Sequence, residues 1–379
     1  MSLIFSPGKL GSVEIKNRLV HSATYECMAA QDGQVTDQLV KRYGTLARGG
    51  IGLIIPGHLY VHPDGKAMHK QTAIHSDEMI PGLNKIAREV QQYEGRVIFQ
   101  LAHAGRQTRW GQVGKKPMGP SRGWRDPISL THPREMTQED IQAVIDQFKK
   151  AGTRAMEAGA DGVQLHAAHG YLINQFLSPF FNRRKDSWGG TDEKRFRFLD
   201  EILLVLRKVL PTGAPLLVKL NTHDHTPRRG ITLALAAYYA QRLVEREIDG
   251  VEISSGTASY SFMNTCRGKV QVNGFAEAFP RWVRPFFKMI LKTWNGKYEL
   301  DEPYHIDAAK IIKPILGRIP LLIVGGLRRV SQMDDVLEHG YADFISMSRP
   351  FIREPLLANA MKEGKTDHAA CDSCNACLA

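Results

Sequence analysis

Two histidines and a tyrosine stand close together in the stretch GVQLHAAHGYLINQFLSP, which runs from Gly162 to Pro179. His166 and His169 lie three residues apart, where a short apolar run breaks into a turn, and Tyr171 follows two positions later. Paired N–H donors can hold an oxygen atom on which negative charge develops. A phenol close by can donate a proton. The residue types and their spacing therefore indicate binding of a carbonyl oxygen followed by proton transfer.

Two other interpretations of the histidine pair are open. A metal site would need a third ligand, and the remaining histidines, such as His103 and His223, are scattered, with no carboxylate at a recognisable ligand spacing. Structural histidines, satisfied by their own hydrogen bonds, would need no ligand at all. The sequence favours the oxygen-binding interpretation, and we expect no metal at this pair.

Polar residues inside apolar runs indicate a second group of ligand contacts. Lys219 lies within a strongly apolar run, where a charge is costly unless it is paired, and Gln100 is placed similarly. A cation and an amide that face one bound heterocycle would suit a ring that gains negative charge. An internal salt bridge of Lys219 is the alternative, and the sequence alone does not decide between them.

A phosphate site is indicated at two other places in the chain. Gly325 and Gly326 precede Arg328, and Ser348 precedes Arg349. Glycines let a phosphate approach backbone N–H groups, and an arginine fork can bind its oxygens. Simple turn glycines are the alternative.

Eight β-rich runs alternate with stretches of helical periodicity, which implies parallel strands joined by crossover helices. Eight such units favour a closed (β/α)8 TIM barrel of the α/β class over an open doubly wound sheet. In such a barrel the residues at the carboxyl ends of the strands form the active site, and loops seven and eight are the usual phosphate site. The runs are Arg18–Ala23, Ile51–Ile55, Arg96–Ala102, Gly162–Ala167, Pro215–Leu220, Gly250–Ser255, Pro320–Gly326 and Ala342–Ser348.

Local signals agree with a repeated unit. The helical stretch 137–160 opens with Thr137 and has Asp140 three residues later, which is close to a capping-box pattern. The triplets ADG, IDG and YAD, at Asp161, Asp249 and Asp343, all precede a β-rich run. They predict similar helix-to-strand turns.

A long insertion interrupts the pattern after the sixth strand. We predict a barrel over residues 1–365, an insertion over residues 257–304 that lies over the barrel mouth, and a tail over residues 366–379. The part from Cys266 to Lys297 carries seven Lys or Arg against one Glu, with two Trp and four Phe. It is either a subdomain with solvated charges, which we favour, or a lid that contacts an anionic group.

The composition limits the classes of partner. The chain has 379 residues, 43% of them hydrophobic, and a formal net charge of +11. A basic chain can bind nucleic acid or anionic lipid, but no basic helix face, zinc finger or aromatic RNA platform is present. No run of roughly 20 apolar residues and no signal-peptide pattern occurs. We therefore expect a small-molecule substrate, with neither nucleic acid nor membrane as a partner.

The five cysteines are odd in number and accompany no secretion signal. This argues against a disulfide framework and favours a reducing cytoplasmic location.

The sequence resembles the Old Yellow Enzyme family of FMN-dependent NADH:flavin oxidoreductases. The resemblance lies in GVQLHAAHGYLINQFLSPFFNRRKDSWGGTDEKRFRFLDEIL, IFSPGKLGSVEIKNRLVHSAT, GLII, FQLAHAGRQ, IVGGL and MSRPFIREP, in family order and over nearly the whole barrel. It implies a barrel with FMN at its mouth. It also implies ping-pong chemistry of the ene-reductase type, in which NAD(P)H reduces FMN and the reduced flavin passes hydride to the β-carbon of an activated alkene. We further expect a homo-oligomer.

The resemblance also implies a role for each matching residue. His166 and His169 would hold the substrate carbonyl or nitro oxygen, and Tyr171 would donate the proton to the α-carbon. Gln100 would bond the flavin pyrimidine, and Lys219 would stabilise the reduced anion near flavin N1 and C2=O. The other implied cofactor contacts are Ala23, Thr24, Tyr25, Gly57 and His58 along the isoalloxazine, and Gly325, Gly326, Ser348 and Arg349 at the phosphate.

Two of these residues depart from the family pattern. Tyr25 stands where many relatives carry Thr or Cys, and Lys219 replaces a common Arg, which gives a point charge in place of a fork. Both departures bear on the redox potential of the flavin and leave the fold unaffected.

The C-terminal stretch CDSCNACLA resembles the cluster-binding segment of the larger 2,4-dienoyl-CoA reductase and trimethylamine dehydrogenase type. Cys371, Cys374 and Cys377 have the spacing C-x2-C-x2-C, and those relatives use a fourth cysteine further on. We therefore expect a [4Fe-4S] cluster only if the chain is truncated or a fourth ligand is supplied.

Two alternatives to an ene-reductase follow from the sequence. The chain could be the barrel portion of such an iron–sulfur flavoprotein, with amine oxidation the less favoured activity because the histidine pair suits an anionic oxygen. It could also be a phosphate-binding aldolase or isomerase barrel without flavin, in which Lys219 forms a Schiff base.

Overall fold

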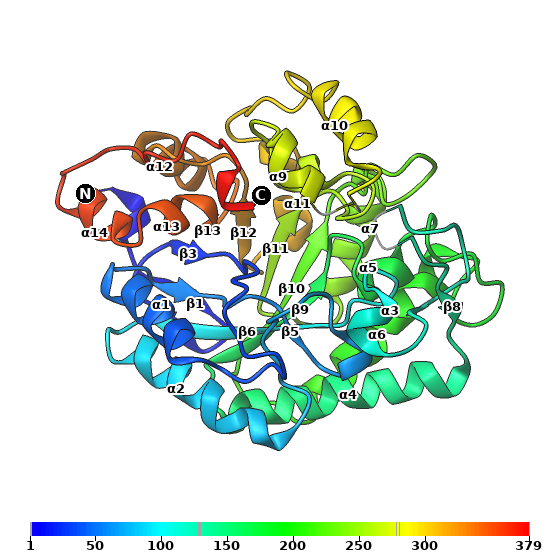
Figure 1. The fold of residues 1–379 in the computed structure, drawn as a ribbon. Helices are drawn as coiled ribbons and strands as arrows, with labels where there is room; N and C mark the ends of the chain where they lie inside the picture. Colours follow the sequence, from blue (N-terminus) through cyan, green and yellow to red (C-terminus); the bar gives the residue numbers. More distant parts are fainter. Residues whose placement is uncertain (1, 128–129, 278, 280, 379) are drawn as a thin grey trace.

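Eight parallel strands close into a barrel in the computed structural model, which describes residues 2–127, 130–277, 279 and 281–378 (Figure 1). Each strand pairs with the next, and the last pairs with the first. The predicted (β/α)8 fold is confirmed, and the third and fourth strands begin and end where the sequence placed them. The barrel strands are β3 (Leu19–His21), β4 (Leu53–Ile54), β6 (Arg96–Ala102), β9 (Gly162–Ala167), β10 (Leu216–Asn221), β11 (Gly250–Ser254), β12 (Leu321–Val324) and β13 (Phe344–Met347).

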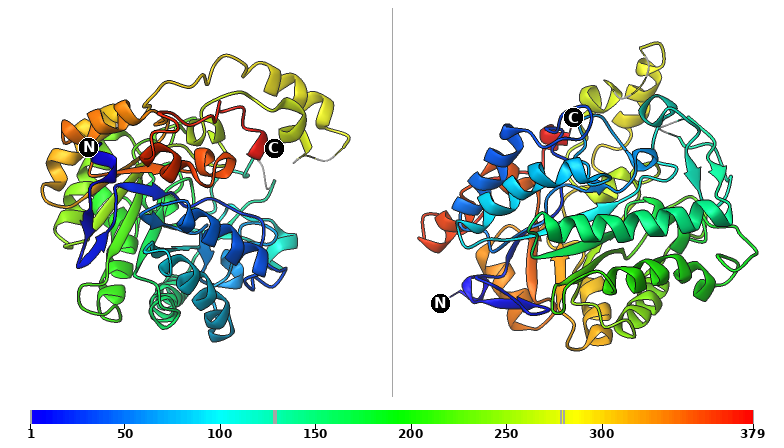
Figure 2. Two further views of the ribbon diagram at one scale, coloured as in Figure 1. Left: turned by 90° about the vertical axis from the view of Figure 1, so that its left-hand side faces the viewer. Right: turned by 90° about the horizontal axis from the view of Figure 1, so that it is seen from below.

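Helices surround the barrel and carry the chain from each strand to the next (Figure 2). Thr137 and Asp140 cap one of them reciprocally, since each side chain accepts a hydrogen bond from the other's backbone N–H, and this confirms the predicted capping box. No helix in the described ranges is both long and apolar enough to cross a membrane. The covering helices are α1 (Asp37–Arg48), α2 (Ile80–Gln91), α4 (Gln138–Glu157), α6 (Asp192–Arg207), α7 (Leu233–Val244), α11 (Ile306–Leu316), α12 (Val330–Glu338), α13 (Arg349–Arg353) and α14 (Leu357–Lys362).

The barrel interior is apolar at the end where the strands begin. A hairpin of β1 (Gly8–Leu10) and β2 (Val13–Ile15) contributes to this lower layer. A larger apolar core lies between the strands and the helices. Polar side chains inside the barrel are therefore concentrated near the carboxyl ends of the strands. The buried residues of the lower layer are Leu10, Ile15, Val20, Leu53, Ile55, Ile98, Leu217, Leu322 and Phe344.

The three predicted aspartate turns share one hydrogen-bonding arrangement. Asp161, Asp249 and Asp343 each accept a hydrogen bond from a backbone N–H near the start of the preceding barrel strand, at 2.7–2.8 Å. Each carboxylate also forms an ion pair with a basic side chain. The aspartates thus join neighbouring strands where the helix-to-strand turns end. Their respective partners are Val97 and Arg96, Leu216 and Arg207, and Leu321 and Lys313.

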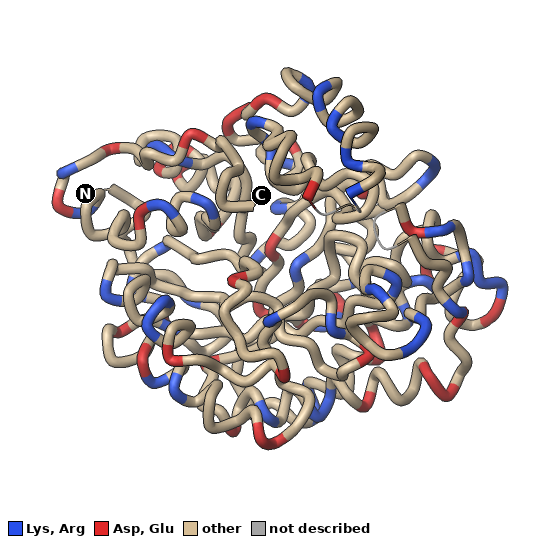
Figure 3. Tube along the Cα trace, viewed as in Figure 1, with Lys and Arg blue, Asp and Glu red and all other residues tan. Residues whose placement is uncertain are grey.

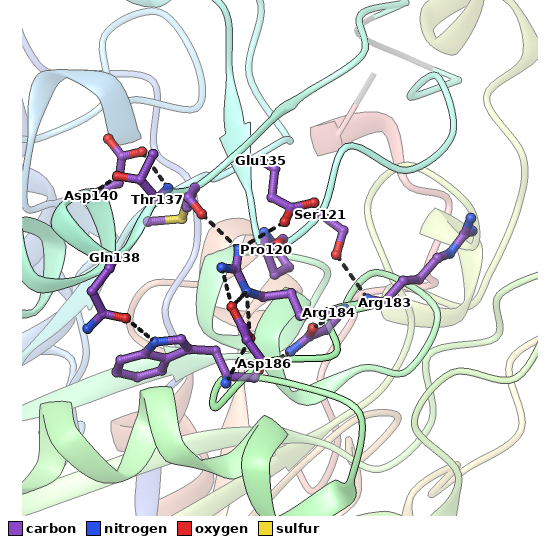
Figure 4. Close-up of polar contacts among 12 residues, drawn as sticks. Pro120, Ser121, Glu135, Thr137, Gln138, Asp140, Arg183, Arg184 and Asp186 are labelled. Carbon is purple, nitrogen blue, oxygen red and sulfur yellow. Dashed lines mark hydrogen bonds and ion pairs between the residues drawn. The ribbon is translucent and has the colours of Figure 1, made fainter.

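An excursion of the chain between β6 and α4 is tied to the loop that follows α5 (Figure 4). Arg184 donates to Pro120 O at 2.9 Å and to Met136 O at 2.7 Å, and it pairs with Asp186 at 2.6 Å. This arginine fixes the loop against the excursion. The elements concerned are α3 (Trp110–Val113), β7 (Met118–Gly119), β8 (Arg134–Glu135) and α5 (Leu172–Leu177).

The segment between β11 and α11 projects beyond the rest of the molecule (Figure 2). Lys and Arg gather along its helix α10 (Figure 3), where Arg284, Lys288 and Lys292 recur every four residues, so this helix has the basic face that was not found in the sequence. The neighbourhood of α10 also exposes Trp282, Phe286 and Met289. The helices of this segment are α8 (Phe262–Thr265), α9 (Val272–Glu277) and α10 (Arg284–Lys292). The remaining short elements are β5 (Leu59–Tyr60) and the 3-10 helices η1 (Leu3–Phe5), η2 (Pro63–Gly65), η3 (Asp77–Met79) and η4 (Ala376–Leu378).

Removing one strand-joining carboxylate should destabilise the barrel. Asp249→Ala should lower the free energy of unfolding by about 1–3 kcal/mol, because the Leu216 N–H and Arg207 lose a charged partner. Asp249→Asn keeps an acceptor oxygen and should lose less. Urea unfolding of both variants measures the difference, and equal stability of both variants and the unmodified chain would contradict the assigned role.

Candidate active site

The turn after β9 holds His169 in an unusual backbone conformation. Its φ is +60°, and Gly170 follows with φ +79°. A non-glycine residue in this left-handed region is strained and persists only where the surroundings determine it. Asn221 accepts a hydrogen bond from the His169 N–H, while the His169 carbonyl accepts from Gln107 at 2.7 Å and from the Ala258 N–H at 3.0 Å. These bonds hold the imidazole of His169 at the end of the strand.

Four aromatic side chains meet at this turn. The imidazole of His166 lies 5.2 Å from that of His169 and 4.7 Å from the ring of Tyr171, measured between ring centroids. The imidazole of His58, from the loop after β4, lies 5.7 Å from that of His166. The structure thus brings together the histidine pair and the tyrosine that the sequence singled out, and it adds the side chain of His58, which the resemblance had placed along the flavin.

The imidazoles in this cluster are neutral over the physiological range. Burial lowers the pKa of His166 and of His169 well below the ordinary value, because a buried positive charge would lose its hydration, and the charge of Lys219 adds to the effect. For the same reasons the pKa of His58 falls to about 4. A neutral imidazole carries one N–H donor, so each ring can donate one hydrogen bond.

Hydrogen bonds indicate which nitrogen of His169 can face a ligand. Its Nε2 lies 2.7 Å from Ser254 Oγ. If the Ser254 hydroxyl donates this bond, the proton of the imidazole lies on Nδ1. Nδ1 of His166 is buried and has no hydrogen-bond partner among the described residues.

A polar layer crosses the barrel interior beneath these rings. Lys219 pairs with Glu252 at 3.3 Å and donates to Ser22 Oγ at 2.8 Å. Gln100 donates to Gln164 at 2.6 Å, and Gln164 in turn donates to Glu252 at 3.1 Å. Each of these five residues is at most 3% exposed. Lys219 therefore has the internal salt bridge that the sequence left open, and it also lines the pocket described next.

A pocket of about 860 Å³, part of it open to solvent, lies at the mouth of the barrel. Three cations, Lys219, Arg328 and Arg349, line it, and no Asp or Glu is among the described residues that do so. Such a lining fits an anionic ligand. The sequence-predicted residues Ala23, Thr24, His169, Lys219, Gly325, Gly326, Ser348 and Arg349 all line this pocket.

Three of the remaining predicted cofactor contacts line a separate, smaller pocket. They are Tyr25, Gly57 and His58. A Cβ atom at Gly57 would lie 2.2 Å from Thr24 O, so only glycine lets these two loops approach. Gln100 lies within the polar layer of the barrel interior and lines neither pocket.

The C-terminal tail borders the larger pocket. Cys371 lines it together with Ser373 and Leu378. Arg349 donates to Asn375 Oδ1 at 2.6 Å, so the tail contacts the predicted phosphate-binding arginine. In the described part of the chain, no three Cys, His, Asp or Glu side chains lie close enough together to hold a metal ion.

The sequence model of the NADH:flavin oxidoreductase / NADH oxidase family matches residues 3–267. The chain belongs to this family. The Old Yellow Enzyme resemblance seen in the sequence is therefore confirmed.

Relatives of two lengths match the chain. An NADPH dehydrogenase of Bacillus cytotoxicus is 37% identical over 93% of this chain and 90% of its own length. An NADH oxidase of Thermoanaerobacter brockii is 32% identical over 98% of this chain and 52% of its own. The structure of 2-naphthoyl-CoA reductase with 2-naphthoyl-CoA has a TM-score of 0.83 and 27% identity, and the match covers 98% of this chain and 54% of that one. The chain thus spans about half the length of the last two proteins.

Several residues of the site were not predicted from the sequence. Glu252 is a charged residue inside an apolar run, which is the same signal that singled out Lys219, so it could have been found. Gln71 and Ser254 gave no comparable signal, because their roles depend on the loops and strands that place them beside His58 and His169.

The buried imidazoles should make stability depend on pH. Burial lowers the pKa of nine histidines, six of which are the most deeply enclosed, whereas in the unfolded chain each titrates near 6.5. As the pH falls from about 6.5 to about 4, the unfolded chain binds more protons than the folded one, so stability is lost over this window at about 1.36 kcal/mol per pH unit for each group. The six are His21 and His103, with a pKa of about 3, His58 and His305, with a pKa of about 4, and His166 and His169.

Urea unfolding at about pH 7, 6 and 5 measures this slope. His103→Asn is a matched control, since its amide oxygen can replace the nitrogen that accepts from the Gly105 N–H. It should reduce the slope by the contribution of one group. A free energy of unfolding that stays constant over the range would disprove that these rings are held neutral.

Proposed function

We propose that the chain is an FMN-dependent oxidoreductase that uses NAD(P)H to reduce the activated C=C bond of α,β-unsaturated carbonyl compounds. The observation that carries the proposal is the cluster of His166, His169 and Tyr171 beside a pocket lined by three cations and, among the described residues, no carboxylate. Membership of the NADH:flavin oxidoreductase / NADH oxidase family supports the cofactor assignment.

The residues at the barrel mouth fit FMN. Arg349, with Ser348 and the backbone of Gly325 and Gly326, would bind the phosphate, since arginine forks onto phosphate oxygens. Lys219 would face the ring edge that becomes anionic on reduction. Bound FMN would supply reversible hydride transfer, from NAD(P)H and to the substrate. Ala23, Thr24 and Tyr25, with the backbone of Gly57 and His58, would line the ring, and Gln100 would bond its pyrimidine edge.

The chain's own residues would act on the carbonyl and on a proton. His166 and His169 are neutral, and each would donate its single N–H to the substrate oxygen. These two bonds would strengthen as the oxygen becomes enolate-like. Tyr171, 7% exposed, would give its phenol proton to the α-carbon.

A second candidate is the barrel portion of a larger iron–sulfur flavoprotein of the 2,4-dienoyl-CoA reductase type. The cysteine triplet at Cys371, Cys374 and Cys377 favours it, as does the likeness to 2-naphthoyl-CoA reductase. About four irons per chain in protein purified without oxygen would favour this candidate over a barrel that acts alone.

Loss of the phosphate-binding arginine should weaken FMN retention. Arg349→Ala should raise the dissociation constant of FMN about 10- to 100-fold, because a charge-assisted bond contributes roughly 1.5–3 kcal/mol. Fluorescence of released FMN measures it. Arg353→Ala is the matched control, since Arg353 lies on the same helix and pairs with Asp372. Equal FMN retention in both variants and the unmodified chain would disprove the assignment.

The histidine pair and the tyrosine should matter in one half-reaction only. His166→Ala and His169→Ala should slow reoxidation of the reduced flavin by cyclohexenone about 10²- to 10³-fold, the usual effect of removing one donor of an oxyanion site. Tyr171→Phe should slow the same step because it removes the proton donor, while the two histidine hydrogen bonds to the carbonyl oxygen remain. Stopped-flow absorbance of the flavin follows the reaction.

Reoxidation by molecular oxygen is the internal control, because this reaction does not require hydrogen bonds to a carbonyl oxygen. All three variants should keep FMN and react with oxygen at nearly the unmodified rate. If both histidine variants reoxidise with cyclohexenone at the unmodified rate, or lose FMN outright, a structural role replaces the catalytic one.

A further inference from the structure

The side chain of Gln71 has only one possible orientation. Its Oε1 lies 2.7 Å from the backbone nitrogen of Ala67, which can only donate a hydrogen bond. The atom that faces Ala67 must therefore be the amide oxygen, and the amide NH2 points the other way. This removes the ambiguity between oxygen and nitrogen that side-chain amides otherwise carry.

The NH2 group of Gln71 faces His58 with both of its hydrogens. Its nitrogen lies 2.9 Å from His58 Nδ1 and 2.9 Å from the His58 carbonyl oxygen. Since the amide nitrogen can only donate, Nδ1 of His58 must accept. A neutral imidazole has one proton, and that proton therefore lies on Nε2.

The protonated nitrogen of His58 faces Tyr171. Nε2 lies 2.9 Å from Tyr171 Oη, and the two rings meet edge to face at 76°. With the proton on Nε2, the imidazole donates and the phenol oxygen accepts. The hydrogen of the phenol is then not used in this bond and can point elsewhere. The ring of Tyr171 lies 4.7 Å from that of His166, so the phenol stands next to the proposed oxygen-binding pair.

We propose that Gln71 locks His58 in its Nε2–H tautomer, and that His58 as a donor leaves the proton of Tyr171 free for the substrate. This inference rests on the proposed function and adds two positioning residues to it. In the opposite tautomer, Nε2 of His58 would accept a hydrogen bond, and the Tyr171 hydroxyl would donate its hydrogen to His58.

The same bond assists the transfer itself. As hydride reaches the β-carbon, the O–H bond of Tyr171 breaks, its electron pair stays on the oxygen, and the proton forms a C–H bond at the α-carbon. Burial raises the pKa of Tyr171 and thus opposes formation of the phenolate. The N–H of His58 stabilises the phenolate, because hydrogen bonds to charged groups are stronger than those to neutral ones. Water returns a proton to the oxygen once the product has left.

The tautomer can be measured directly in the FMN-loaded protein. In ¹⁵N-histidine NMR, protonated and unprotonated ring nitrogens give separate signals, and His58→Leu identifies those of His58. We expect a protonated Nε2, and a mixture of tautomers in Gln71→Leu. A protonated Nδ1 in the unmodified chain overturns the inference, whatever the activity.

Kinetics test the consequence for Tyr171. His58→Leu should slow flavin reoxidation by cyclohexenone about 10- to 100-fold, the loss of one hydrogen bond to a developing charge, while the oxygen reaction is retained. Gln71→Leu should lose less, and His58→Gln, which keeps an N–H donor, should restore part of the rate. His103→Leu, at another buried histidine, is the matched control and should leave this rate nearly unchanged.

A double substitution separates positioning from packing. In a Tyr171→Phe background, His58→Leu should cause no further loss, because no proton is left to direct. An equal loss in both backgrounds would mean that His58 acts by packing alone, and the inference would be wrong. If Tyr171→Phe by itself has no effect, the proposed proton donor fails, and the inference falls with it.

Discussion

The buried ion pair between Lys219 and Glu252 constrains everything above it in the barrel. Two charges removed from water are tolerated only if they are paired and hydrogen-bonded. Here the register of adjacent parallel strands sets Lys219 directly beside Glu252, and Ser22 and Gln164 supply further bonds. The apolar layer beneath and the closed ring of strands hold this arrangement in place. A shift of one residue in either strand would turn one of the charges toward the covering helices.

The same pair sets the electrostatics of the candidate active site. Glu252 is bonded within the polar layer, whereas Lys219 also lines the pocket. The positively charged member of the ion pair therefore borders the pocket. Burial, with a smaller contribution from that positive charge, lowers the pKa of His166 and of His169. One lysine would therefore serve both parts of the proposed chemistry. It would favour an anionic ring, and its charge adds to the burial that lowers the pKa of the neighbouring imidazoles.

Much of this could be predicted from the sequence, because strand periodicity and polar residues at strand ends are local signals. The aspartate turns and the capping box at Thr137 have the same local character. The partners of the site residues could not be predicted in this way. Gln71 lies 100 residues before Tyr171, and the two meet through His58 only because separate loops converge at one end of the barrel. Lys219 shows the same limit, since the sequence found the buried charge but not its partner.

Some polar groups in this site have hydrogen-bond partners within the chain, and others have none among the described residues. Gln71, Ser254 and Asn221 have their bonding capacity directed at the rings or at the strained turn, where they fix orientation. His166 Nδ1, by contrast, is buried without a partner among the described residues. A buried polar atom left unbonded costs about 1–3 kcal/mol. A ligand atom that bonded to this nitrogen would remove that cost, as the proposed carbonyl oxygen would.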